Sequence, residues 1–121
     1  VEVYNAGGHT PGTMAYRFIL PGGLKAAMHG GIGTNTLSSA YSKKKNIGTT
    51  WRDAFIEHVR NLFDLEVDIV LGNHPEQSRT FEKRDGMDGQ NNPFIDPEEW
   101  NRMIAACERR YNRIQEQDPI E

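Results

Sequence analysis

The pattern of hydrophobic positions predicts three short strands at the start of the chain. Residues 1–4, Val-Glu-Val-Tyr, alternate as a half-buried strand does. The run Met14–Leu20 is rich in strand-forming residues and ends at Pro21-Gly22-Gly23, which is a strong turn signal. The apolar pattern returns over residues 24–28. We therefore expect the second and third runs to pair as a hairpin.

Helical spacing dominates the rest of the chain. A helix is predicted to begin near Thr50, which would cap it with Asp53 at the answering position. Its apolar side chains recur on one face, at Trp51, Phe55, Val59, Leu62 and Phe63. A second helix is predicted over residues 96–117, with Asp96 as its cap and Pro97 at its first position.

A buried-looking strand is predicted between the two helices, at residues 67–71, where Gly72 ends the apolar run. Residues 34–48, which include Lys43-Lys44-Lys45, and residues 82–95 are polar and are expected to form exposed loops. A helix that leads so closely into a strand is typical of layered packing. The predicted class is α/β, a small mixed sheet with the two main helices on one face.

Composition excludes several classes of protein. The 121 residues carry a net charge of −3, whereas a general affinity for nucleic acid needs a basic surface. No apolar run approaches the roughly 20 residues that span a bilayer, so we expect neither nucleic acid nor membrane as a partner. The single cysteine, Cys107, rules out an internal disulfide and a cysteine-rich zinc finger, and its place on an apolar helical stripe predicts core packing.

Three of the four histidines occupy comparable places. His9, His29 and His74 each follow a predicted strand and lie close to glycine. Side chains at the ends of neighbouring strands converge on one edge of a sheet, and convergent imidazoles are what zinc requires. The alternative is that each is a solvated loop residue. His58 differs, because it lies within a predicted helix and is expected to pack rather than to bind metal.

Two segments carry a family resemblance. Residues 7–13, Gly-Gly-His-Thr-Pro-Gly-Thr, resemble the Gly-His-Thr-Pro-Gly-Ser/Thr segment of the metallo-β-lactamase superfamily. Residues 67–75, Val-Asp-Ile-Val-Leu-Gly-Asn-His-Pro, are similar to its Asp-Val-Leu-Leu-x-x-His-Pro segment. The His-Pro pair, followed by Ser78, looks closest to the class B β-lactamases that use no cysteine ligand.

The resemblance implies half of a four-layered αβ/βα sandwich, residues 1–121 forming its C-terminal half. It implies a dinuclear zinc site in which His9 is the last histidine of the first site and His74 the last of the second. Zinc-bound water would then hydrolyse an amide or ester of a small-molecule substrate. The His-x-His-x-Asp-His motif, which supplies the other ligands, is absent.

Further residues are assigned only by the resemblance. Gly30 stands where β-lactamases of this family carry cysteine or serine, and where other members carry a bridging aspartate. His29, Gly30 and Ser78 are therefore candidates for supporting the ligands or facing the substrate. With only two protein ligands, we expect this chain by itself to bind zinc weakly or not at all and to be inactive.

Two functional hypotheses follow. The first is a fragment of a zinc hydrolase whose partner is the missing N-terminal half, since Val1 begins within a predicted strand and suggests a piece of a longer protein. The second is a non-catalytic binding module on the same scaffold. The strand at residues 14–20 places Met14, Tyr16, Phe18 and Leu20 on one side. Without a covering half, this apolar side predicts a homo-oligomer. The alternative is that residues 34–48 or 82–95 fold over it.

Overall fold

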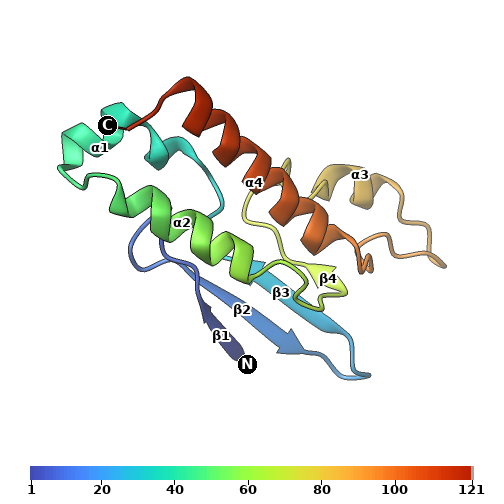
Figure 1. The fold of residues 1–121 in the computed structure, drawn as a ribbon. Coiled ribbons are helices and arrows are strands. Elements are labelled where there is room, and N and C mark those ends of the chain that lie inside the picture. The colour runs from blue at the N-terminus through green and yellow to red at the C-terminus, as the bar shows by residue number, and fades with distance from the viewer. Residues whose placement is uncertain (121) are drawn as a thin grey trace.

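The computed structural model describes residues 1–120, which form one mixed sheet covered on one face by helices (Figure 1). The strands are β1 (Glu2–Asn5), β2 (Met14–Ile19), β3 (Lys25–His29) and β4 (Ile69–Val70), in the order β1-β2-β3-β4. The pairs β1–β2 and β2–β3 are antiparallel, whereas β3 and β4 are parallel. The predicted α/β class with a small mixed sheet is confirmed.

The hairpin between β2 and β3 forms where the turn residues predicted it. The Gly23 N–H donates to the Leu20 carbonyl oxygen at 2.9 Å. Gly22 and Gly23 have φ values of 92° and 94°, a conformation that side chains with a Cβ rarely adopt. These two glycines let the chain reverse within four residues of the end of β2.

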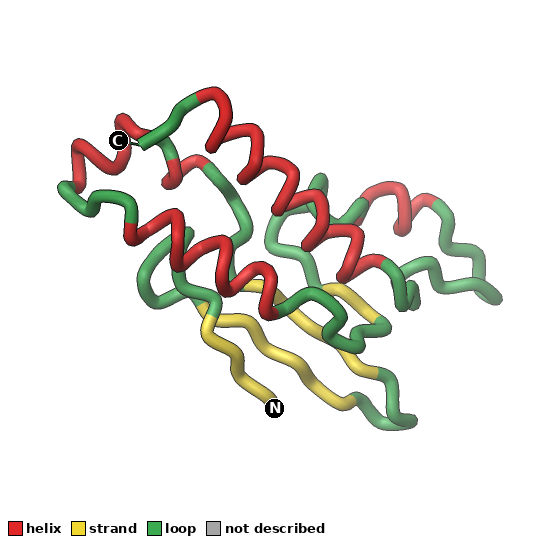
Figure 2. Tube along the Cα trace, in the orientation of Figure 1, coloured by secondary structure: helices red, strands yellow, loops and turns green. Residues whose placement is uncertain are grey.

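Two long helices lie side by side on one face of the sheet, α2 (Thr50–Asn61) and α4 (Glu99–Gln117), as Figures 1 and 2 show. Thr50 was predicted to cap this helix, but it is the first residue of α2. The capping position is Thr49, whose side chain makes no capping bond. The prediction that Asp96 caps the last helix was wrong, because α4 begins at Glu99 and Glu98 is at the capping position. The Asp96 carboxylate accepts the Glu98 N–H at 3.1 Å, so it supports the turn that leads into α4.

The prediction of loops over residues 34–48 and 82–95 was wrong in part. The first segment contains the 3-10 helix η1 (Asn35–Leu37) and the helix α1 (Ser39–Lys45), and α3 (Thr80–Asp85) enters the second. The Ser38 hydroxyl accepts the Tyr41 N–H and caps α1, and Asn46 ends it in the left-handed conformation. These short helices lack an apolar stripe, so hydrophobic periodicity did not reveal them.

The core lies between the helices and the covered face of the sheet. Ala15 and Ala27 on the sheet are fully buried, and small side chains there let the helices approach closely. Trp100 of α4 is fully buried and donates its indole N–H to the Leu62 carbonyl oxygen at 2.9 Å. The buried cluster also contains Phe55, Val59, Val67, Val70, Met103, Ile104, Cys107 and Tyr111. Cys107 is thus a core residue, as predicted.

The opposite face of the sheet carries apolar side chains in register. Val3, Tyr16 and Met28 are direct neighbours across β1, β2 and β3, and Phe18 of β2 faces Ala26 of β3. Val3 is 54% exposed, and the aromatic side chains of β2 are half-buried. Both long helices lie on the other side (Figure 1). We call Val3, Tyr16, Phe18, Met28 and Ile69 the open sheet face.

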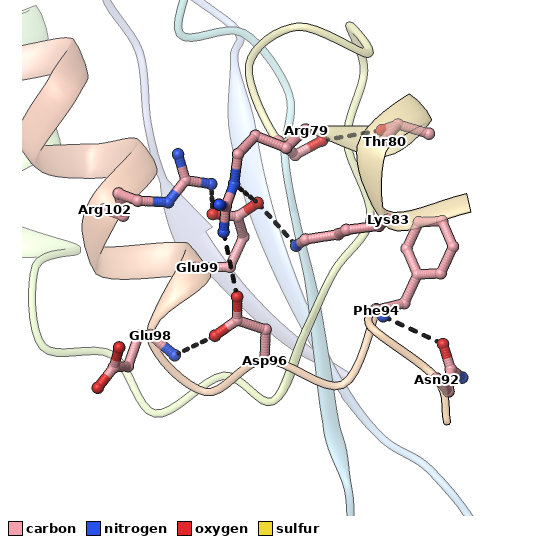
Figure 3. Close-up of polar contacts among 10 residues, drawn as sticks. Arg79, Thr80, Lys83, Asn92, Phe94, Asp96, Glu98, Glu99 and Arg102 are labelled. Carbon is pink, nitrogen blue, oxygen red and sulfur yellow. Dashed lines mark hydrogen bonds and ion pairs between the residues drawn. The ribbon is translucent and has the colours of Figure 1, made fainter. Parts of the chain in front are cut away.

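An ion cluster around the buried pair of Lys83 and Glu99 joins α3 to the start of α4 (Figure 3). The Glu99 carboxylate has no exposed surface, and Lys83 of α3 lies 2.7 Å from it with only 6% exposure. Arg102 also pairs with this carboxylate, and Arg79 lies 3.3 Å from Asp96. These ion pairs hold α3, which is polar and has no apolar stripe, against α4.

None of the helices in residues 1–120 combines the length and apolar character needed to cross a membrane.

Candidate functional site

The sheet topology places three histidines at one edge. Because β2 is antiparallel to both of its neighbours and β4 is parallel to β3, the strands β1, β3 and β4 all run in the same direction. His29 ends β3, His9 follows β1, and His74 follows β4. The Asn73 side-chain amide donates to the His29 carbonyl oxygen at 2.7 Å, which ties the loop after β4 to the end of β3.

His9 has one ring nitrogen engaged by the protein. Its Nδ1 lies 2.7 Å from the carbonyl oxygen of Gly33. A carbonyl oxygen only accepts, so Nδ1 carries the hydrogen and the neutral ring keeps its lone pair on Nε2. A backbone carbonyl on the remote nitrogen is the usual partner of a histidine that binds metal through the other nitrogen. His9 therefore has the orientation that an imidazole ligand needs.

The segment at residues 31–36 encloses the His9 ring. A Cβ on Gly31 would lie 2.7 Å from Cδ2 of His9, and one on Gly33 would lie 3.3 Å from Cε1. The Thr36 hydroxyl donates to the His9 carbonyl oxygen at 2.9 Å. Glycine is needed at position 31 because the imidazole occupies the space that any side chain would take.

The loop that presents His9 is closed by local hydrogen bonds. The Gly7 N–H donates to the Asn5 side-chain oxygen at 3.0 Å, and the Gly8 N–H donates to the Thr10 carbonyl oxygen at 2.9 Å. The Thr10 and Thr13 hydroxyls lie 2.8 Å apart. Residues 5–13 therefore hold the backbone of His9 in one conformation.

His29 lies beneath the edge, against the helices. It is only 5% exposed, and its ring centroid is 6.4 Å from that of Trp100. The Gly31 N–H donates to its Nδ1 at 3.1 Å, which leaves Nε2 buried without a partner. Burial, together with the nearby charge of His9, lowers the pKa of His29 to about 4. The ring is therefore neutral near pH 7.

The other predicted residues differ in exposure. His74 is exposed, and Gly30 is exposed at the edge, with its N–H donating to the Met14 carbonyl oxygen at 2.9 Å. Ser78 is 2% exposed, and its hydroxyl lies 3.2 Å from that of Thr80. A Cβ on Gly72 would lie 2.1 Å from the Ser78 oxygen, so this serine packs beneath the loop that carries His74.

The donor chemistry of the edge suits zinc, because neutral imidazole nitrogen is among its preferred ligands. Within residues 1–120, however, no three His, Cys, Asp or Glu side chains lie together in a way that could hold a metal ion. Catalytic zinc sites usually have three protein ligands. By themselves, the described residues do not form such a site.

Sequence reasoning missed four supporting contacts, made by Gly31, Gly33, Thr36 and His58. His58, which was expected only to pack, has its Nδ1 2.6 Å from the Gly7 carbonyl oxygen. Three of these contacts act on or through the backbone, so residue type gave little sign of them. The Gly31-Ile32-Gly33 pattern was the one available signal of a close approach.

Comparison with known proteins reveals a likeness of fold. No protein-family model matches the sequence, and neither does any curated protein. Among solved structures, BJP-1, a subclass B3 metallo-β-lactamase of Bradyrhizobium japonicum, is similar with a TM-score of 0.79 and 21% identity over 95% of this chain. FEZ-1, a metallo-β-lactamase from Legionella gormanii, has a TM-score of 0.74 and 26% identity over 95%. A metallo-β-lactamase of Cronobacter sakazakii has a TM-score of 0.71 and 24% identity over 88%.

The match covers only part of each of these proteins. This chain corresponds to 44% of BJP-1, 45% of FEZ-1 and 42% of the Cronobacter sakazakii enzyme. The chain therefore has the architecture of about half of a metallo-β-lactamase fold. The expected resemblance to this superfamily is confirmed at the level of the fold.

Proposed function

We propose that this chain is the C-terminal half of a zinc-dependent hydrolase that resembles metallo-β-lactamases. The observation that carries the proposal is the orientation of His9, whose Nδ1 is engaged by Gly33 while Nε2 stays available at the edge of the sheet. The likeness to less than half of BJP-1 and FEZ-1 supports it.

His9 and His74 would hold zinc through their imidazoles, and the remaining ligands would come from a second half. Bound zinc supplies Lewis acidity, which lowers the pKa of water and polarises the carbonyl of an amide or ester. Two residues of this chain hold His9 in the orientation that metal binding needs. The Gly33 carbonyl fixes its tautomer, and Thr36 fixes its backbone. His29, Gly30 and Ser78 would support the ligands or face the small-molecule substrate.

The first experiment asks what the chain does alone. We expect weak zinc binding by isothermal titration calorimetry and no hydrolysis of a β-lactam, because two imidazoles are too few for a tight catalytic site. The variant His9→Ala should abolish the weak binding, and Glu57→Gln, an exposed change on α2, should preserve it. Turnover of a β-lactam by these 121 residues, lost with a chelator, would contradict the proposal that a second half is needed.

The second experiment uses the gene from which the chain comes. A His-x-His-x-Asp-His motif encoded within about 150 residues upstream, the usual length of a domain, would support the hydrolase. In that longer protein, His9→Ala or His74→Ala should lower activity by orders of magnitude. Near-normal activity in either variant would remove that residue from the site.

A non-catalytic binding module is the second candidate. It is favoured by one observation, that the described residues bring no three metal-ligating side chains together. A start codon close to Val1, together with the absence of zinc binding by the chain, would support it over the hydrolase.

We propose that the open sheet face packs against the second half of the same protein. Support comes from the solved structures, in which 55% or more of each chain has no counterpart here. A monomer rarely leaves more than a few hundred Å² of apolar surface uncovered. Alone, the chain would therefore pair this face with that of a second copy, since two-fold dimers are the commonest closed assemblies.

Sedimentation equilibrium at tens of micromolar would test this pairing. Phe18→Glu, on the open sheet face, should convert the dimer to a monomer. Ile19→Glu is the matched control, because Ile19 is 66% exposed and its side chain points to the other side of the same strand. A wild-type chain that stays monomeric at all concentrations would exclude self-association through this face.

A further inference from the structure

A long-range hydrogen bond joins α2 to the loop that presents His9. His58 Nδ1 lies 2.6 Å from the carbonyl oxygen of Gly7, 51 residues earlier in the chain. Because the carbonyl can only accept, the histidine must donate through Nδ1. His58 therefore acts as a fixed donor to the main chain, two residues before His9.

The same helix makes a second, steric contact with this loop. A Cβ on Gly8 would lie 2.4 Å from Cα of Phe55, which precedes His58 by one helical turn. Gly8 also has a φ of 150°, which a residue with a side chain rarely adopts. Phe55 is 1% exposed and belongs to the core. The backbone of residues 7–8 thus rests directly on α2, with the His58 bond holding it there.

His9 is supported from two independent directions. On one side, α2 contacts Gly7 and Gly8. On the other, Gly33 accepts from the imidazole and Thr36 donates to the His9 carbonyl oxygen. Hydrogen bonds within residues 5–13 hold the loop in its own conformation. The contacts with α2 hold that loop in place against the helix layer.

We infer that His58 is a positioning residue for His9, acting through the Gly7 carbonyl and not as a ligand itself. The inference rests on the proposed role of His9 in binding metal. Removing the donor would release residues 7–8 from α2, lengthen the bond from His9 to Gly33, and let the imidazole exchange between its two tautomers.

The test uses the full chain without metal first. Long-range ¹H–¹⁵N spectra of the imidazoles should show His9 in the single tautomer protonated at Nδ1. His58→Leu should give a mixture of tautomers at His9. His58→Asn, whose amide N–H can stand where Nδ1–H stood, should restore the wild-type pattern. Glu57→Gln, on the exposed side of the same helix, should leave it unchanged.

Zinc titration of the same proteins gives the second readout. Loss of the direct outer partner of a metal-binding histidine typically costs about 10- to 100-fold in affinity. His58 acts on the His9 ring only through the Gly7 backbone, so His58→Leu should weaken zinc binding by up to about 10-fold, and His58→Asn should recover most of the loss. If His58→Leu does not fold, judged by circular dichroism, His58→Gln replaces it, since its longer side chain moves the donor away from the Nδ1 position.

The outcomes separate the two ideas. A wild-type tautomer and wild-type zinc affinity in a folded His58→Leu or His58→Gln protein would overturn the positioning role. Near-normal activity of His9→Ala in the longer protein would remove His9 from the site, and the tautomer spectra of this chain would still decide whether His58 positions the ring.

Discussion

The imidazole Nδ1 of His9 lies 2.7 Å from the carbonyl oxygen of Gly33, although 24 residues separate them in the chain. The bond crosses from the loop after β1 to the segment after β3, which are not neighbouring strands in the sheet. It fixes the tautomer of His9 and hence the nitrogen that is available to a ligand. The His9 imidazole therefore links the loop after β1 to the segment after β3 at this edge of the sheet.

We expect Gly31→Ala to displace the His9 ring. The new Cβ would lie 2.7 Å from Cδ2 of His9, closer than real contacts allow. The ring must then shift, which disturbs its bond to Gly33, and overpacking of this kind typically costs about 1–3 kcal/mol. Urea unfolding measures the loss of stability, and the imidazole spectra report the loss of the single tautomer.

Gly12→Ala is the matched control for this change. A Cβ at Gly12 would meet no atom within 4 Å, and Gly12 lies in the same loop as His9. We expect its stability to stay within about 0.5 kcal/mol of wild type, as is usual for a surface substitution. Equal effects of the two alanines would show that the loop, and not the His9 ring, is sensitive to side chains.

The main elements of the fold could be predicted because their side chains alternate or recur with regular periods. Residues 14–28 carried both strand pattern and turn residues, and α2 and α4 carried apolar stripes. The polar helices α1 and α3 could not be found this way. The Ser38 cap stabilises α1, and the ion pairs of Lys83 with Glu99 stabilise α3.

The candidate site was predictable only in part for the same reason. His9 and His74 could be identified as candidates because each is a histidine that follows a predicted strand and lies close to glycine. The topology of the sheet brings those strand ends to one edge. Gly33 and His58 act through backbone carbonyls over long sequence separations. Contacts of that kind depend on how α2 and the segment after β3 pack, which no local pattern encodes.

The buried ion cluster gives a prediction about stability. Glu99→Gln removes a fully buried negative charge and leaves Lys83, which is 6% exposed, without its closest partner. Breaking a buried pair from one side typically costs about 3–5 kcal/mol. Urea unfolding should show a loss of that order, and α3 should lose protection from hydrogen exchange before α2 does.

Two further variants check the cause. Glu98→Gln changes an exposed neighbour on the same turn and should have little effect on the free energy of unfolding. The double variant Lys83→Met with Glu99→Leu removes both charges and should recover much of the stability, since apolar replacements of buried pairs are often neutral. A double variant as unstable as Glu99→Gln would mean that helix packing, rather than an unpaired charge, sets the cost.

The burial of His29 predicts that stability falls in mild acid. Its pKa is lowered from 6.5 to about 4, first by burial and then by the charge of His9. Between these values the unfolded chain takes up a proton at His29 and the folded chain does not. The stabilisation is therefore present in full above about pH 6.5 and is lost as the pH falls through about 4. A shift of this size corresponds to about 3 kcal/mol.

Comparison with His29→Asn isolates this contribution. Asparagine does not titrate, and its side-chain oxygen can still accept the Gly31 N–H that now donates to Nδ1. Urea unfolding in the presence of a chelator, from pH 8 to pH 4, should give a constant difference between the proteins above pH 7. The difference should shrink below pH 6.5, because only the wild type loses the His29 contribution. Parallel curves over the whole range would show that His29 can take up a proton in the folded protein.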